Sequence, residues 1–157
     1  MNIAFCTFVS LSCYGGIEVR MVEMARLLTE RGHQVSIYAT PYSYGGRKVE
    51  PEKFLQGIPY REAWRHKIEA DVAYIYYYSP LVWRVLFSID CPKIAAMHPA
   101  GILSKSSLRG WLFKTIGSQD LASFDAVRIQ SPIFRFKHNH VFRIPDWVDT
   151  RAFTPLQ

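Results

Sequence analysis

The chain lacks the features that mark several specialised classes of protein. Its 157 residues contain no apolar run close to the roughly eighteen residues of a membrane-spanning helix, and the N-terminus has no basic-then-apolar leader pattern. The three cysteines, Cys6, Cys13 and Cys91, are odd in number and have no CxxC spacing. This pattern argues against a disulfide framework and favours buried free thiols over a metal site. We expect a cytoplasmic globular domain that holds no metal.

Two familiar nucleotide-binding patterns are also missing. Gly15 and Gly16 lack the GxGxxG spacing of a dinucleotide-binding fold, and the Lys-Ser/Thr pair of a P-loop does not follow them. The sequence therefore predicts no dinucleotide cofactor, and we expect no cofactor of another kind.

The first forty residues have the pattern of a β-α-β unit. Residues 3–7 form a short apolar run, and from residue 17 apolar side chains recur at steps of three and four, as on one face of a helix. Gly32 predicts the end of that helix, and residues 35–39 are rich in the branched and aromatic side chains that favour a strand. Strands joined in this way run parallel, and ligands of parallel sheets lie at the carboxyl ends of the strands.

Gly15 and Gly16 lie at this carboxyl edge, immediately before the helix. Two residues without side chains let the backbone approach an anion and direct N–H groups at it, which would make a phosphate site. The same pair could instead serve only to make a tight turn into the helix. The glycines alone do not decide between these two interpretations.

The chain opens and closes with phrases that resemble the retaining GT-B glycosyltransferases. Residues 15–18 (GGIE) and 24–35 (MARLLTERGHQV) resemble the GG-x-E turn of that family and the end of the helix after it. Residues 144–155 (IPDWVDTRAFTP) resemble the segment that joins the two Rossmann-like domains of those enzymes, although Asp146 and Trp147 replace the usual Asn and Gly.

The resemblance implies an α/β fold with a Rossmann-like open parallel sheet flanked by helices. Residues 1–143 would be the N-terminal, acceptor-side domain, and residues 144–157 would begin the linker to a donor-binding domain outside this chain. Such an enzyme moves a sugar from a nucleotide-sugar donor to a glycan or lipid-linked acceptor with retention of configuration. The resemblance implies that Gly15 and Gly16 approach the diphosphate of the donor, and that the isolated domain is inactive.

Two later strands end in candidate site residues. The apolar and aromatic run 72–78 predicts a central strand, and Tyr76 and Tyr78 near its carboxyl end could contact an acceptor or simply belong to the core. A second strand is predicted at 94–97, directly before His98. A lone histidine is more often a structural hydrogen-bonding group, but the resemblance implies that His98 faces the transferred sugar as a catalytic residue.

The segment 125–130 predicts a further strand, followed by Ser131. Arg128 and Gln130 lie on one side of it, which is typical of an edge strand and leaves a functional arginine as the alternative. With the resemblance, Arg128 and Ser131 are acceptor-side candidates. The sequence also predicts a last short strand at 140–144.

Helices are predicted in the connections between these strands. A short one is expected at 51–55 and another from Pro80 to about residue 87, since proline is tolerated at the first helical position. In the polar segment 60–69, Ala63, Trp64 and Ile68 would share one helical face. That narrow apolar stripe predicts a helix lying against the sheet.

The positive charge of the chain is concentrated in one region. Eight basic and two acidic residues lie between Lys93 and Arg143, and this stretch carries the whole net charge of +6. Residues 104–115 combine basic side chains with a Trp-Leu-Phe cluster, as in a helix at the surface of an anionic membrane, or in a basic helix packed on the sheet. No nucleic-acid-binding motif is present. A non-catalytic protein that binds a phosphate ligand or docks on a membrane is the alternative to the glycosyltransferase.

Overall fold

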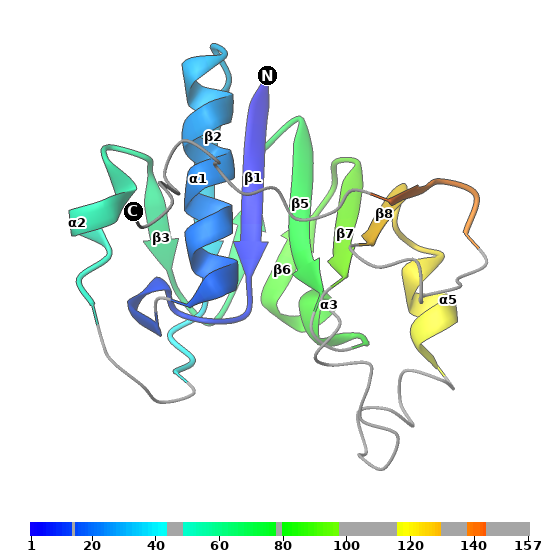
Figure 1. Cartoon of the computed structure of the whole chain (residues 1–157). Helices are drawn as coiled ribbons and strands as arrows, with labels where there is room; N and C mark the ends of the chain where they lie inside the picture. Colours follow the sequence, from blue (N-terminus) through cyan, green and yellow to red (C-terminus); the bar gives the residue numbers. More distant parts are fainter. Residues whose placement is uncertain (14, 44–48, 78–79, 98–115, 130–137, 144–157) are drawn as a thin grey trace, which may run out of the picture.

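Seven strands form one parallel sheet in the order β3-β2-β1-β5-β7-β8-β9 (Figure 1). The computed structural model describes residues 1–13, 15–43, 49–77, 80–97, 116–129 and 138–143. Every pairing between the described strands is parallel, and two further short strands, β4 and β6, pair with each other. The strands are β1 (Asn2–Thr7), β2 (Gln34–Ala39), β3 (Tyr60–Glu62), β4 (His66–Ile68), β5 (Val72–Tyr77), β6 (Phe87–Ile89), β7 (Lys93–Met97), β8 (Ala126–Ile129) and β9 (Val141–Arg143); the helices are η1 (Leu11–Cys13), α1 (Gly16–Glu30), α2 (Glu52–Leu55), α3 (Val82–Leu86) and α5 (Ser118–Leu121).

The expected β-α-β unit and the α/β fold class are confirmed. Helix α1 joins β1 to β2, and the two strands pair in parallel. The helix ends where predicted, because Gly32 has the left-handed φ of 84° and its N–H donates to the carbonyl of Thr29 at 2.9 Å. The N–H of His33 closes the same turn on the carbonyl of Leu28 at 3.1 Å.

The two faces of the sheet are covered differently. Helix α1 packs Met21, Val22 and Ala25 onto one face, against Phe5 and Ile37 from β1 and β2. The other face carries no long helix among the described residues. Part of it is covered by α3 and by the small β4-β6 sheet (Figure 1). None of the helices in the described part of the chain is long and apolar enough to cross a membrane.

The predicted helix over residues 60–69 is wrong. Strand β3 pairs with β2, and β4 pairs with β6. In β4 the burial alternates, since His66 and Ile68 are buried and Lys67 is exposed, as expected of a strand rather than a helix. Trp64 is 58% exposed, so its ring does not lie against the sheet. Strand pairing with partners distant in sequence has overridden the local helical pattern.

One other expectation needs correction. Strand β8 lies between β7 and β9 and is therefore not an edge strand, so the polar side chain of Arg128 has another explanation. The helices expected at 51–55 and from Pro80 to about residue 87, and the strands expected at 94–97 and 140–144, are present to within two residues of their predicted bounds. Helix α3 ends at Leu86 because Phe87 adopts extended backbone angles and begins β6.

Candidate functional site

The carboxyl ends of β1, β2, β5 and β7 lie along one edge of the sheet. All these strands run the same way, so their carboxyl ends lie on one side of the molecule, where η1 and the first turn of α1 also lie (Figure 1). Ligands of open parallel sheets bind at this edge. Gly15 and Gly16 are therefore where a phosphate site was predicted.

The first turn of α1 has two backbone N–H groups available to an anion. Gly15 is the N-cap, in an extended conformation, and its N–H donates to Oε2 of Glu18 at 3.0 Å. The N–H groups of Gly16 and Ile17 have no hydrogen-bond partner in the described part of the chain. The partial positive charge of the helix N-terminus adds to their attraction for an anion.

Glu18 is a buried carboxyl group beneath this turn. Burial raises its pKa, while hydrogen bonds from the N–H groups of Gly15 and of Glu18 itself lower it. Glu18 belongs to the GGIE phrase that carries the resemblance, but no role was predicted for it, although a Glu three residues after an N-cap is a recognisable capping signal.

Gly16 has no structural need to be glycine. A Cβ atom built on it would meet none of the described residues within 4 Å, and its φ is not in the left-handed region. A side chain at this position would therefore project into space that the described residues leave open. The absence of a side chain is therefore useful only if something approaches the backbone there.

Hydrogen bonds fix the loop between β1 and α1. The hydroxyl of Ser10 donates to Oε2 of Glu62 at 2.6 Å, and the hydroxyl of Ser12, at 2.9 Å from that of Ser10, donates to it in turn. The N–H of Ser10 donates to the carbonyl of Tyr42 at 2.9 Å, and Thr40 donates its hydroxyl proton to the carbonyl of Phe8. The glycine turn is thus held by groups that follow β1, β2 and β3.

Tyr60 completes this polar cluster. Its hydroxyl is hydrogen-bonded to Oε2 of Glu62, the same oxygen that Ser10 contacts. Burial raises the pKa of Tyr60, and the hydrogen bond and negative charge of Glu62 raise it further. The phenol is therefore a hydrogen-bond donor at neutral pH, and it keeps Glu62 against the loop.

The other predicted site residues that the structure describes, Tyr76 and Arg128, lie on the face of the sheet that carries α1 rather than at the open edge. Tyr76 is buried in the cluster beneath the helix, with its ring centroid 5.5 Å from that of Tyr74. Nη1 of Arg128 donates to the hydroxyl of Tyr74 at 3.0 Å. This hydrogen bond explains why an inner strand such as β8 contains Arg128, which had been interpreted as typical of an edge strand. Tyr78, His98 and Ser131 lie outside the described residues, as does the segment 104–115.

Asp120 was missed entirely, although it is one of the two acids in the basic region. It is 2% exposed and accepts hydrogen bonds from the N–H of Leu81 at 2.9 Å, Nε1 of Trp83 at 3.1 Å and Nε of Arg84 at 3.0 Å. Its contacts with these three residues at the start of α3 are structural.

Within the described ranges, no three His, Cys, Asp or Glu side chains come together as a metal site. Cys6, Cys13 and Cys91 are all free thiols. Burial raises the pKa of Cys6 and of Cys91, so neither is a reactive thiolate at neutral pH.

The parallel sheet with helices on its faces defines a Rossmann-like α/β protein. Its fold is similar to that of MurG from Acinetobacter baumannii, with a TM-score of 0.50 and 13% sequence identity over 88% of this chain. The match supports the fold of the GT-B glycosyltransferases, and it covers 44% of that protein, so this chain spans less than half of its length. No family model matches the sequence, and no curated protein matches it either.

Proposed function

We propose that this chain is the N-terminal, acceptor-side part of a glycosyltransferase with the GT-B fold. The enzyme would move a sugar from a nucleotide-sugar donor to a glycan or lipid-linked acceptor. One observation carries the proposal: Gly16 opens a helix N-terminus at the carboxyl edge of a GT-B-like sheet, where packing gives no reason for a glycine. A diphosphate is the part of a nucleotide sugar that such a turn fits.

The turn would act on the leaving group. When the glycosyl bond breaks, the departing nucleoside diphosphate gains negative charge, and fixed N–H donors lower the energy of that charge without reorganising. Gly16 and Ile17 would supply these donors. Gly15 would contribute only its lack of a side chain, because its N–H is already bonded to Glu18. This refines the sequence-based expectation that treated the two glycines alike.

The finer parts of the proposal rest on the resemblance alone. Retention of configuration and the catalytic role of His98 come from the opening and closing phrases, since a shared fold carries no information about stereochemistry. Tyr78 and Ser131 remain acceptor-side candidates on the same basis. For Tyr76 and Arg128, the contacts with Tyr74 favour a structural role. A cytoplasmic location and membrane contact through residues 104–115 also remain proposals.

The second domain is part of the proposal. In this family the donor is held mainly by the C-terminal domain, so the 157-residue chain by itself would not turn over a nucleotide sugar. The decisive experiment measures the mass of the native polypeptide in its source cell. A polypeptide longer by about one domain, roughly 100 residues or more, agrees with the proposal. A native mass of 18.2 kDa would refute the two-domain enzyme.

Activity is then tested on the longer polypeptide. We expect one nucleotide sugar from a panel to be hydrolysed or transferred, and Gly16→Val to reduce kcat/KM by about tenfold or more, because a side chain would cover the N–H donors. Lys53→Gln, an exposed charge change on α2, is the matched control. Equal activities of Gly16→Val and the wild type would refute the role of the turn.

A further inference from the structure

A cavity lies on the face of the sheet opposite α1. It has a volume of about 520 Å³ and runs over the strands β1 and β2 beside the chain that links β3 to β4. None of its lining residues belongs to the loop between β1 and α1. The cavity is therefore separate from the turn at which we propose that the donor diphosphate binds. Its volume is within the usual range of small-molecule sites.

Small side chains create this cavity. Ala4 and Ser36 are partners in the β1-β2 register, and their side chains form the floor. The connection after β3 crosses this face as the short strand β4, which pairs with β6 and leaves the floor of the cavity uncovered. A longer side chain at position 4 or 36 would fill the space that is left.

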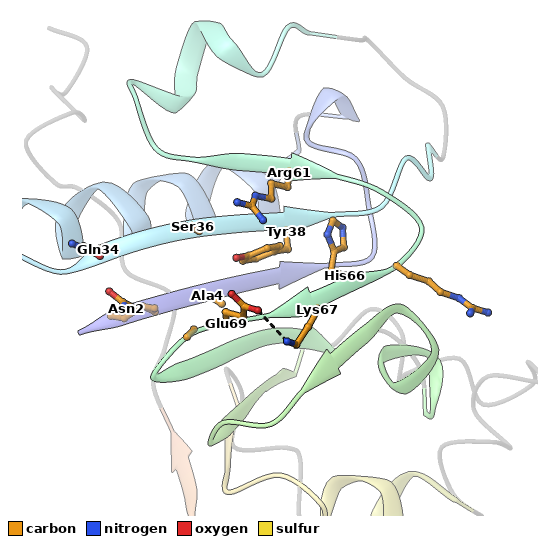
Figure 2. A pocket seen from close by; sticks show the side chains of 12 residues that line it. Asn2, Ala4, Gln34, Ser36, Tyr38, Arg61, His66, Lys67 and Glu69 are labelled. Atoms are coloured by element: carbon orange, nitrogen blue, oxygen red, sulfur yellow. Dashed lines mark ion pairs between the residues drawn. The ribbon is translucent and has the colours of Figure 1, made fainter.

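Tyr38 directs a polar group into the cavity. The residue is only 7% exposed, but its hydroxyl is open to the cavity and has no hydrogen-bond partner in the described part of the chain. Its ring is fixed by an edge contact with His66, whose Nε2 donates to the carbonyl of Ala39 at 2.7 Å. Figure 2 shows the hydroxyl directed along the cavity toward Gln34 and Asn2. A polar ligand in the cavity can therefore replace solvent as the partner of this hydroxyl.

The charge of the lining is positive. Arg61 comes from β3, and its side chain lies on the face opposite Glu62, whose carboxylate is bonded to Ser10 and Tyr60. Arg61 and Arg65 have no ion-pair partner among the residues that the structure describes, whereas Lys67 is paired with Glu69 at 3.1 Å.

Figure 2 shows Tyr38 between Arg61 on one side and the pair of Lys67 and Glu69 on the other. The cavity thus has unpaired guanidinium groups and a free phenol on its walls. Amide and hydroxyl side chains line the rest of it, from Asn2, Gln34 and Ser36.

We propose that this cavity binds a phosphorylated monosaccharide. A guanidinium group matches the geometry of a phosphate and forms charge-assisted hydrogen bonds with it. The amide and hydroxyl groups can both donate and accept hydrogen bonds, as the hydroxyls of a sugar require. The volume of about 520 Å³ accommodates one sugar ring with its phosphate. The site goes beyond the proposed glycosyl transfer, because it needs neither the donor nor a second domain.

The test is a titration of the chain with glucose 6-phosphate, followed by calorimetry and by amide NMR. We expect binding with the largest shifts at Ser36, Tyr38 and Arg61, weaker binding of inorganic phosphate, and weaker binding of uncharged glucose. Arg61→Gln should reduce the affinity by about tenfold or more, the usual effect of losing a charge-assisted hydrogen bond. Lys53→Gln, on α2 and outside the cavity, is the charge-matched control and should bind as the wild type does.

Tyr38→Phe separates binding from folding. The hydroxyl has no partner among the residues that the structure describes, so its removal should leave the free energy of unfolding unchanged while reducing the affinity about fivefold. The proposal is overturned if Arg61→Gln binds glucose 6-phosphate as tightly as the wild type, or if the shifts appear only at Gly16 and Ile17. It is also overturned if the chain dimerises in sedimentation experiments and Arg61→Gln abolishes the dimer, since a second copy would then occupy the cavity.

Discussion

The hydroxyl of Ser10 donates a hydrogen bond of 2.6 Å to Oε2 of Glu62, and these two residues are 52 positions apart in the sequence. Ser10 belongs to the loop that leads to the glycine turn, and Glu62 is the last residue of β3. The first strand and the third are thereby joined at the edge where the proposed site lies. This contact therefore helps to position the loop that leads to the glycine turn.

The contact predicts coupled effects of substitution. Ser10→Ala should lower the free energy of unfolding by about 1 kcal/mol. A double-mutant cycle with Glu62→Gln should give a coupling energy of about 0.5 to 1.5 kcal/mol between the two residues. Urea unfolding of the wild type, the two single variants and the double variant measures this coupling energy. Ser88→Ala, which changes an exposed serine of β6, should have no effect beyond about 0.5 kcal/mol. Strictly additive effects would mean that the loop is held by other contacts.

The parts of the fold that sequence could predict are those with strong local signals. The helix after Gly16 has a regular apolar period, Gly32 supplies a left-handed cap, and strand 72–77 is a continuous apolar and aromatic run. The glycine turn was predicted at the carboxyl edge because a β-α-β unit leaves no other place for it. All of these follow from residues close together in the chain.

The parts that failed depend on partners distant in the sequence. Residues 60–69 contain two strands of only three residues each, and their partners in β2 and β6 are about twenty residues away on either side. Arg128 looked like an edge residue because its partner, the hydroxyl of Tyr74, is 54 positions earlier. The uncharged hydroxyl of Tyr38 gave no signal, because only the fold shows that it has no partner.

Gly16→Ala is predicted to separate stability from binding. The added Cβ meets no atom within 4 Å, and alanine favours a helix more than glycine does, so the free energy of unfolding should rise by up to about 1 kcal/mol. The same methyl group lies where an anion would approach. We expect weaker binding of inorganic pyrophosphate, measured from the NMR shifts of the Ile17 amide. A variant that is destabilised, or that binds pyrophosphate as tightly as the wild type, would contradict this account of the turn.

Glu18 predicts a dependence of stability on pH. Burial raises its pKa above the ordinary value of 4.5, so at a pH just above that value the folded state keeps a proton that the unfolded state has released. The free energy of unfolding therefore falls as pH rises from about 4.5 to the raised pKa, and the contribution of Glu18 is constant above it. Glu18→Gln keeps an oxygen that accepts the N–H of Gly15 and cannot ionise.

We expect the stability of Glu18→Gln relative to the wild type to increase with pH across this window. Urea unfolding at several values between about pH 4 and pH 8 measures the difference, in which the other titrating groups cancel. Glu52→Gln, an exposed change in the first turn of α2, is the matched control. A constant difference between Glu18→Gln and the wild type would show that folding does not change the pKa of Glu18.

Asp120 gives the largest predicted loss of stability. Its carboxylate accepts hydrogen bonds from the N-cap residue Leu81 and from Trp83 and Arg84 in α3. Removing it leaves the N–H of Leu81 and the indole N–H of Trp83 without this acceptor. Arg84 is 48% exposed and can be solvated instead, so its share of the loss is small. We expect Asp120→Ala to lower the free energy of unfolding by about 2 to 3 kcal/mol.

Asp90→Ala, which removes an exposed carboxylate near the same helix, is the charge-matched control and should change stability by less than about 0.5 kcal/mol. Asp120→Asn tests the geometry, because its single amide oxygen can replace only part of the acceptor set, and it should fall between the wild type and Asp120→Ala. Trp83 packs against Phe124 with ring centroids 4.8 Å apart, and its ring loses this fixed position once the indole N–H has no acceptor. The change in tryptophan fluorescence should therefore be larger for Asp120→Ala than for Asp120→Asn. Equal stabilities of the Asp90 and Asp120 variants would instead mean that α3 is held by the apolar packing of Trp83 and Leu86 in the core alone.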